Sequence, residues 1–283
     1  MKPPRFRYAR PGSVEEAVRT IAEAGGYAQP LAGGQSLVPL LNFRLAHPAL
    51  LVDLNFLDQL TSIKEDDGWL LLGSMVRLRA AETSAVVASA CPLLAAALRH
   101  VGHLQIRNRG TVGGSIAHAD PAAELPALMV GLEGQIVVQS VRGRRVIEAA
   151  DFFLDPFITS LASDELVVEL RLPKLPDNRT SFTEFSQRSG DFALAGVGVS
   201  ISYDHGHVTS ARMGALGVGP TPVRLREAEQ VLVGSPLSDE VIENAAAVAS
   251  GEVEPLEDIH GDSSYRRELL AVLLSRSLKE VRA

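Results

Sequence analysis

Two short stretches of the sequence pair adjacent glycines with small polar residues. The first is Ala32-Gly33-Gly34-Gln35-Ser36-Leu37, which follows a short stretch that reads as a strand. Adjacent glycines can adopt positive φ angles and carry no Cβ, so their backbone N–H groups can converge closely on an anionic oxygen. The stretch therefore favours a phosphate cradle, although a Gly-Gly pair after a strand is more often a plain turn.

The second stretch, from Arg109 to Ser115, repeats this chemistry with threonine and serine hydroxyls on either side of Gly113-Gly114. Asp120 and Pro121 follow, and they are residue types preferred at the N-cap and the first position of a helix. Taken alone, the stretch reads as a tight loop ahead of a capped helix. Two such turns on separate α/β units indicate instead one elongated ligand with two phosphates, which is the description of a dinucleotide.

Neither turn matches the usual nucleotide-binding fingerprints. Neither contains the G-x-G-x-x-G pattern of dinucleotide-binding folds, and neither contains the lysine of a P-loop. A Rossmann NAD site and a P-loop nucleotidase are therefore disfavoured. The residues by themselves lead to a cofactor that contains a diphosphate, with FAD as the preferred candidate, and they do not lead to a reaction.

Other side chains that could do chemistry are few. His100 and His103 lie three residues apart, but no third ligand at metal-site spacing accompanies them. His118 falls next to the second turn, where a structural hydrogen bond is favoured over catalysis. The sequence shows no Ser-His-Asp or Cys-His arrangement at recognisable spacing. We therefore predict neither a catalytic side chain nor a metal site.

The first turn lies in a predicted small α/β unit. Ser13 and Glu16 form a capping box ahead of an amphipathic pattern that stops at Gly25-Gly26, which predicts a helix. Residues 50–54 read as a buried strand. We expect this unit to end near residue 55.

The second turn lies in a second predicted unit. An apolar helix at 92–103 precedes the turn, a helix at 122–132 follows it, and strands at 135–141 and 166–172 come next. A polar break marked by prolines follows at 173–178, and it predicts a domain boundary.

The chain is therefore divided into two predicted domains, residues 1–176 and residues 177–283. The first consists of subdomains of about 1–55 and 56–176. In the second, three strand-like stretches precede three helical ones, which predicts a sheet with appended helices.

Composition limits the class of protein. The 283 residues, 46% hydrophobic and 22% charged, are typical of a globular protein of about two domains. A net charge of −7 argues against a nucleic-acid partner. The single cysteine, Cys91, cannot form an internal disulfide or ligate an iron–sulfur cluster by itself. No stretch has the length of a transmembrane segment and the amino terminus lacks a secretory pattern, so we predict a cytoplasmic location.

Two long motifs together resemble a known family. They are A-G-G-Q-S-L-V-P-L-L-N-F-R-L at 32–45 and I-R-N-R-G-T-V-G-G-S-I-A-H-A-D-P-A-A-E-L-P at 106–126, and the likeness extends through R-S-G-D-F-A at 188–193. The chain is thereby similar to the FAD-binding (medium) subunits of molybdopterin hydroxylases, the family of aerobic carbon monoxide dehydrogenase and xanthine dehydrogenase. The resemblance covers nearly the whole chain.

This resemblance implies an α+β fold. Residues 1–176 are expected to form a PCMH-type FAD-binding domain, which is vanillyl-alcohol-oxidase-like and has two subdomains. Residues 177–283 are expected to form a carbon monoxide dehydrogenase flavoprotein-like α+β domain of three strands and a helical bundle.

The resemblance also implies which residues bind FAD. Contacts to the diphosphate and ribityl are expected on both glycine turns, an acidic contact at the end of the second motif, apolar flavin lining, and a cover over the flavin edge. The full set is Ala32, Gly33, Gly34, Gln35, Ser36, Leu37, Val101, Thr111, Val112, Gly113, Gly114, Ser115, Asp120, Glu124, Leu166, Asp191 and Phe192.

One position departs from the family pattern. Relatives often carry a lysine near the aromatic residue that opens the first strand of the last domain, whereas Phe185 is followed here by Ser186, Gln187 and Arg188. Either Arg188 replaces this cationic contact to the flavin or the contact is absent.

The implied activity is that of an oxidoreductase subunit. A molybdopterin-containing large subunit would hydroxylate the substrate, and [2Fe-2S] clusters of a small subunit would pass electrons to FAD in this chain and on to an external acceptor. A dimer of heterotrimers is the implied assembly.

Two alternatives stay open: a self-contained FAD-dependent oxidoreductase, or a flavin-binding sensor or assembly module. Hydroxylases of carbon monoxide, aldehydes, purines and other N-heterocycles share these motifs, so the substrate and the acceptor stay open as well.

Overall fold

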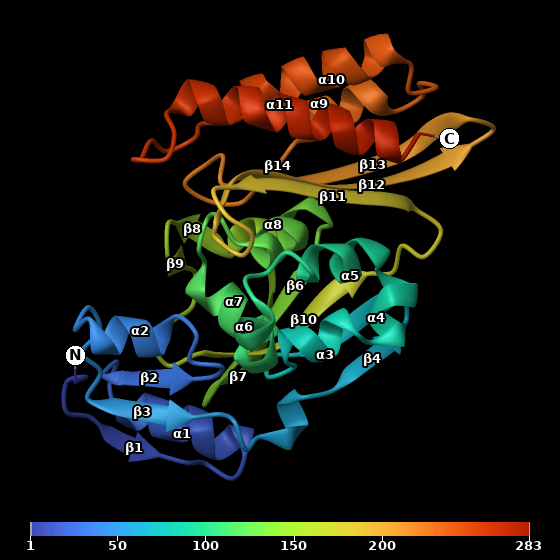
Figure 1. Cartoon of the computed structure of the whole chain (residues 1–283). Helices are drawn as coiled ribbons and strands as arrows, with labels where there is room; N and C mark the ends of the chain where they lie inside the picture. The colour runs from blue at the N-terminus through green and yellow to red at the C-terminus, as the bar shows by residue number, and fades with distance from the viewer. Residues whose placement is uncertain (1, 283) are drawn as a thin grey trace.

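The computed structural model describes residues 2–282 and has an α+β fold built on three main sheets (Figure 1). The amino-terminal sheet lies at one end, a five-stranded sheet occupies the middle, and a four-stranded sheet carries a layer of helices at the other end. Within this described part, no helix combines the length and the apolar character that a membrane crossing requires.

The amino-terminal unit is a parallel sheet with strand order β1-β3-β2 and one long helix on it. Its elements are β1 (Arg7–Ala9), α1 (Val14–Glu23), β2 (Ala28–Leu31), α2 (Leu37–Asn42) and β3 (Leu50–Asp53). The predicted capping box forms in part: Ser13 Oγ accepts from Glu16 N at 3.1 Å, but Glu16 Oε2 accepts at 2.7 Å from Gly12 N, one residue before the N-cap. The first glycine turn connects β2 to α2.

The core of this unit continues into the next one. The buried face of α1, including Val18 and Ile21, packs in one cluster with Val137 and Leu166 of the middle sheet. Burial of these apolar side chains is the main force that holds the two units together. The surface between them is therefore a packed junction, and the two glycine turns lie beside it.

The middle unit is a five-stranded antiparallel sheet in the order β4-β5-β10-β6-β7, with helices beside it. Its strands are β4 (Ile63–Asp66), β5 (Trp69–Gly73), β6 (Gln135–Ser140), β7 (Gly143–Glu148) and β10 (Leu166–Pro173). A small hairpin of β8 (Phe153–Asp155) and β9 (Ile158–Thr159) lies outside the sheet. The helices are α3 (Leu78–Glu82), α4 (Ala85–Ala90), α5 (Pro92–Leu98), α6 (Leu104–Arg109), α7 (Val112–His118) and α8 (Glu124–Gly131), with short 3-10 turns at Asp58–Leu60 and Ala149–Asp151.

Two local predictions for this unit are wrong. The helix expected over 92–103 ends at Leu98, and a separate helix, α6, begins at Leu104. Asp120 is not the N-cap of α8: its Oδ1 accepts from Ala122 N at 2.9 Å, and Ala123 occupies the N-cap position. The side chain of Asp120 thus forms an Asx turn before the helix, a local hydrogen bond to the backbone that Asp residues often make in place of helix capping.

The carboxy-terminal unit is an antiparallel sheet in the order β11-β12-β13-β14, covered on one face by three helices. Its elements are β11 (Arg179–Ser186), β12 (Ala193–Asp204), β13 (His207–Leu216), β14 (Val223–Arg224), α9 (Arg226–Leu232), α10 (Asp239–Gly251) and α11 (Ser263–Glu280). The three predicted strands and three predicted helices are present, and the two-residue β14 adds an edge strand.

This sheet packs closely on the middle unit. A Cβ at Gly131, the last residue of α8, would lie 2.5 Å from the backbone N of Gly214 in β13. Only glycine allows the helix and the strand to approach backbone to backbone in this way. The close packing fixes β13, and with it the paired strand β12, relative to α8.

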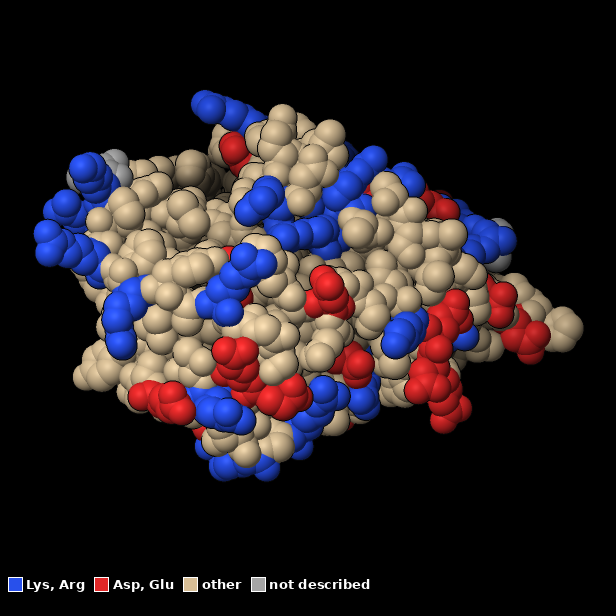
Figure 2. Space-filling view, turned by 90° about the horizontal axis from the view of Figure 1, so that it is seen from below, with Lys and Arg blue, Asp and Glu red and all other residues tan. Residues whose placement is uncertain are grey.

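Charged side chains of both signs share the surface. Figure 2 shows one face of the molecule, seen from below, on which basic and acidic side chains are interspersed. This face therefore carries no broad field of a single sign.

Candidate cofactor site

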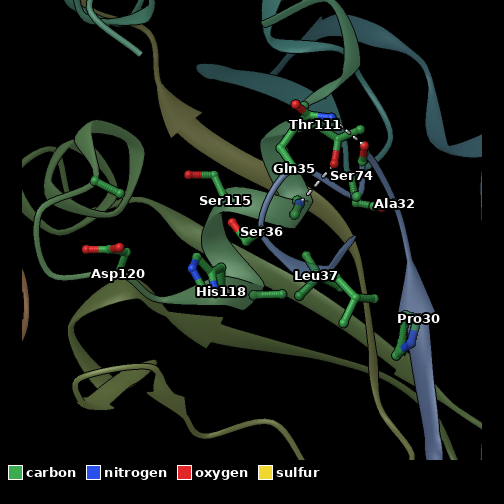
Figure 3. A pocket seen from close by; sticks show the side chains of 18 of the residues that line it. Pro30, Ala32, Gln35, Ser36, Leu37, Ser74, Thr111, Ser115, His118 and Asp120 are labelled. Carbon is green, nitrogen blue, oxygen red and sulfur yellow. Dashed lines mark hydrogen bonds between the residues drawn. The ribbon is translucent and has the colours of Figure 1, made fainter. Parts of the chain in front are cut away.

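A cavity of about 890 Å³ opens where the amino-terminal and middle units meet. Its volume is within the usual range of ligand sites. Both glycine turns line it, and so do the start of α8 and the segment before β12. In Figure 3, Gln35, Ser36 and Leu37 of the first turn lie beside Ser115 and His118 of α7.

Nearly all of the residues predicted to bind the cofactor meet at this cavity. Those that line it are Ala32, Gly33, Gly34, Gln35, Ser36, Leu37, Val101, Thr111, Gly113, Gly114, Ser115, Asp120, Glu124, Leu166, Asp191 and Phe192. Val112 is the exception. Its side chain is fully buried in the core of the middle unit, and its N–H donates to Val76 O at 3.0 Å.

Arg188 does not line the cavity either, and it is exposed. Its carbonyl oxygen accepts a hydrogen bond from Ser186 Oγ at 2.8 Å. In this structure Arg188 does not supply a cationic contact inside the cavity.

The first turn presents a run of unused backbone donors. Within residues 2–282, no acceptor is found for the N–H groups of five consecutive residues, Gly33 to Leu37. Gly34 has a φ of +72°, which the absence of a Cβ permits, and Gln35 Nε2 donates to Gly33 O at 3.1 Å. Unpaired N–H groups beside a cavity require a partner, and an anionic oxygen is a strong one.

The second turn differs from the sequence-based expectation. The N–H groups of Gly113, Gly114 and Ser115 are already used: they donate to Ser74 O at 2.9 Å, to Thr111 Oγ1 at 3.1 Å and to Thr111 O at 3.1 Å. Thr111 caps α7 in this way. The turn therefore offers the cavity side chains, such as the Ser115 hydroxyl, rather than the second set of main-chain donors that was expected.

The two turns are in direct contact. A Cβ at Gly33 would lie 2.3 Å from Arg109 O and 2.7 Å from Gly110 Cα. A Cβ at Gly114 would lie 3.6 Å from Ala32 Cβ and 2.8 Å from Thr111 Oγ1. Glycine at 33 is therefore required for the two turns to pack together.

Ser74 is a site residue that sequence reasoning missed. It lines the cavity directly after β5, and its buried Oγ has no hydrogen-bond partner within residues 2–282. An unpaired buried hydroxyl costs free energy unless a ligand or water satisfies it. A lone serine after an apolar strand has no sequence signal that distinguishes it from a turn residue.

Acidic residues form the wall of the cavity beside α8. Burial, with added repulsion from the carboxylates of Glu184 and Asp120, raises the pKa of Glu124 to about 8. Burial also raises the pKa of Asp120 and lowers the pKa of His118. At neutral pH, Glu124 is therefore mainly an uncharged acid that can donate a hydrogen bond, and His118 is an uncharged imidazole.

The remaining wall is largely apolar and is held by buried polar contacts. Val101 and Leu166 line it, and Phe157 lies with its ring centroid 5.1 Å from that of His118. Arg107, which is not in the predicted set, donates to Val101 O at 3.1 Å and to Glu82 Oε2 at 2.8 Å. Arg107 thereby fixes the segment that presents Val101 to the cavity.

His100 and His103 are not among the residues that line the cavity. His100 Nδ1 lies 3.4 Å from Glu184 Oε1. The ring of His103 packs against Gly190, where a Cβ would lie 2.3 Å from His103 Cε1. Both side chains therefore pack between the middle unit and the carboxy-terminal unit.

These features fit an extended cofactor that contains a diphosphate. Phosphate and ribityl oxygens can meet the Ser74 and Ser115 hydroxyls and the five N–H groups of Gly33 to Leu37, which have no acceptor in the described part of the chain. The apolar wall can meet a flat ring. FAD has both kinds of surface.

Comparisons with known proteins agree with this geometry. The chain matches the family model "FAD binding domain in molybdopterin dehydrogenase" over residues 4–175 and "CO dehydrogenase flavoprotein C-terminal domain" over 180–281. It is 41% identical to the 6-hydroxypseudooxynicotine dehydrogenase complex subunit alpha of Paenarthrobacter nicotinovorans, over 98% of this chain and 95% of that one. It is also 41% identical to the nicotine 6-hydroxylase medium subunit of the same organism, over 100% of this chain and 99% of that one.

A solved structure shares the complete fold. One chain of a carbon monoxide dehydrogenase from Hydrogenophaga pseudoflava, in a form that lacks the Mo-pyranopterin moiety of its molybdenum cofactor, superimposes with a TM-score of 0.96. The two chains are 36% identical, and the match covers 99% of this chain and 98% of that chain.

Proposed function

Because this chain belongs to the family of FAD-binding subunits of molybdopterin dehydrogenases, we propose that it relays electrons from a partner subunit to an external acceptor. It is an oxidoreductase subunit of the carbon monoxide dehydrogenase medium-chain type, and its cofactor is FAD. In the proposal, the electrons come from [2Fe-2S] clusters of a small subunit, and a large molybdopterin subunit hydroxylates the substrate. The proposed assembly is a dimer of heterotrimers.

The observation that carries this proposal is the run of free N–H groups from Gly33 to Leu37 on the wall of the cavity. We assign the pyrophosphate of FAD to these donors. Ser115 and Ser74 would add hydroxyl contacts from the opposite turn and from the end of β5. Their role is to bind and orient, because hydrogen bonds to charged oxygens are strong and directional.

The acidic wall has a second role in the proposal. Protonated Glu124 would donate to an oxygen of the cofactor and would not repel the diphosphate. Neutral His118 and the side chain of Asp120 lie beside it in the cavity lining. We expect Glu124 to hold its proton at neutral pH whenever the cavity excludes water.

The apolar wall would hold the flavin ring. Val101 and Leu166 line the cavity, and Asp191 and Phe192 line it at the segment before β12. Phe192 is 65% exposed, so its ring can cover one edge of a bound flavin and still contact a neighbouring subunit. When bound, FAD supplies the electron transfer itself, in one-electron or two-electron steps.

The only cysteine supports the need for a partner. Cys91 is 1% exposed, and burial raises the pKa of its thiol to about 11. A thiol in this state is a poor ligand for iron. We therefore expect any iron–sulfur cluster and any substrate site to belong to other subunits.

Purification alone and in complex tests the proposal. The chain purified alone with FAD should be yellow and should not oxidise carbon monoxide, an aldehyde or an N-heterocycle. Co-expressed with cluster-bearing and molybdenum-bearing subunits, it should co-purify with them, and a substrate should bleach its flavin absorbance only in that complex. Turnover by the isolated chain would favour a self-contained oxidoreductase, and a flavin that stays oxidised in an active complex would favour a sensor or assembly module.

A further inference from the structure

Two backbone carbonyls, one beside each glycine turn, are held by a pair of side chains. Asn55 Nδ2 donates to Ala32 O at 2.9 Å, and Arg77 Nη1 donates to Arg109 O. The two side chains are joined, because Arg77 Nη2 donates to Asn55 Oδ1 at 2.6 Å. A continuous line of hydrogen bonds therefore runs from Ala32 to Arg109 through Asn55 and Arg77.

The Asn55 end of this line is anchored in the parallel sheet. Asp53 is 7% exposed at the end of β3, and its Oδ1 accepts from Asn55 N at 2.9 Å and from Asn55 Nδ2 at 2.5 Å. The other oxygen, Oδ2, accepts from Tyr8 OH at 2.5 Å. Both oxygens of Asp53 are thus engaged, so the amide of Asn55 has little freedom to rotate away from Ala32.

The Arg77 end acts at the place where the turns touch. Arg109 O, which Arg77 holds, is the same oxygen that would lie 2.3 Å from a Cβ at Gly33. Ala32 O, which Asn55 holds, belongs to the residue immediately before Gly33. The hydrogen-bonded pair therefore fixes both sides of the contact that sets the spacing of the two turns.

We propose that Asn55 and Arg77 form a clamp that positions the backbone donors of Gly33 to Leu37 for the diphosphate of FAD. Neither residue lines the cavity, so both are positioning residues. The inference rests on the proposed function, since it assumes that the first turn binds the diphosphate. The clamp should therefore raise the affinity for flavins that carry phosphates and have little effect on the affinity for a flavin that lacks them.

The test compares FAD with riboflavin, which has no phosphate, on the full chain. Asn55→Ala, Arg77→Gln and the double variant would be titrated with each ligand, and bound flavin followed by fluorescence quenching. The control is Arg171→Gln, which removes the ion pair of Arg171 with Glu169, at 2.8 Å within β10 and outside the cavity lining. The Kd for FAD should rise about tenfold or more in each single variant. The Kd of the double variant should be only slightly higher than that of either single variant, because the effects of substitutions within one hydrogen-bond network do not add.

The outcomes separate the clamp from the proposed function. Riboflavin affinity should stay within about threefold of the parent in each variant, as should FAD affinity in the control. Equal losses for FAD and riboflavin, or unchanged FAD affinity, would overturn the clamp while FAD binding by the parent leaves the proposed function standing. Failure of the parent to bind FAD would overturn both.

If Arg77→Gln does not fold, Arg77→Lys replaces it in the test. Lysine keeps the charge but lacks the planar guanidinium that binds Arg109 O and Asn55 Oδ1 together. The same selective loss of FAD affinity is expected.

Discussion

Gly33 and the carbonyl oxygen of Arg109 meet across the two glycine turns, although 76 positions separate the residues (109 − 33). A Cβ at position 33 would lie 2.3 Å from that oxygen, a separation that real Cβ atoms essentially never show. Contact with backbone atoms leaves no side chain that could rotate away. The space between the turns is therefore set by the absence of a single methyl group.

Replacement of Gly33 by alanine should consequently separate the turns and weaken FAD binding, and Gly33→Val should abolish flavin retention. The ratio of flavin to protein absorbance after gel filtration measures this. The matched control is Gly251→Ala, because a Cβ at Gly251 meets no atom within 4 Å. Full flavin retention by Gly33→Val would contradict the assignment of the diphosphate to this turn.

Gly114→Val should also release the flavin, for a different reason. The added side chain would press on Thr111 Oγ1, 2.8 Å from the position of the Cβ, and would disturb the cap that accepts from Gly114 N. Loss of such a cap costs about 1 kcal/mol of stability. The melting temperature of the apoprotein should thus fall together with flavin retention, and a variant that keeps its flavin would show that this turn is not part of the site.

Glu124→Gln should change how stability depends on pH. The pKa of Glu124 is about 8 in the folded protein and near 4.5 when the chain is unfolded, so the folded state binds the extra proton. The contribution of this group is fully present below pH 4.5 and is lost as the pH rises through 8. Near pH 9 the variant should therefore be more stable than the parent, by about 1 kcal/mol or more.

Urea unfolding of the apoproteins at pH 6 and near pH 9 would measure this difference. Glu243→Gln is a suitable control, because Glu243 is an exposed residue on α10. The parent and the control should lose stability over this pH interval, and Glu124→Gln should lose less. A parallel pH dependence in all three proteins would mean that Glu124 titrates as an ordinary exposed carboxyl.

His118→Ala should leave most of the FAD bound. His118 lines the cavity, and burial lowers the pKa of its imidazole, so it brings no positive charge to the diphosphate at neutral pH. Its ring packs against Phe157, a contact that contributes only modestly. We expect the Kd for FAD to change by less than about fivefold. A colourless protein after gel filtration would show that His118 is a principal ligand.

Local chemistry was enough to predict the parts of the site that depend on neighbouring residues. Ser13 caps α1 as expected, and the Gly33-Gly34 turn follows a strand and leaves its N–H groups without an acceptor within residues 2–282. Both features depend on fewer than ten consecutive residues. The resemblance to a family then indicated which distant segments meet them.

Contacts between distant segments could not be predicted in the same way. The amides of the second turn looked available, but Gly113 N donates to Ser74 O and Val112 N donates to Val76 O, two acceptors almost forty positions upstream. Their availability depends on how β5 packs against α7, which no local pattern encodes. The same is true of the line from Asn55 to Arg77, because each residue by itself is an ordinary loop residue.

Ser74→Ala separates stability from cofactor binding more sharply than the other variants. The Oγ of Ser74 is buried and has no partner within residues 2–282, so the apoprotein bears the cost of an unsatisfied hydroxyl. Its removal should raise the stability of the apoprotein by about 1 kcal/mol. If the same hydroxyl bonds to FAD, the Kd for FAD should rise about fivefold to tenfold. The two effects have opposite signs, and a general disturbance of the fold would give two losses instead. Urea unfolding of the apoprotein and a fluorescence titration with FAD measure them separately. A variant that is more stable and binds FAD as tightly as the parent would show that the hydroxyl of Ser74 is not a ligand of the cofactor.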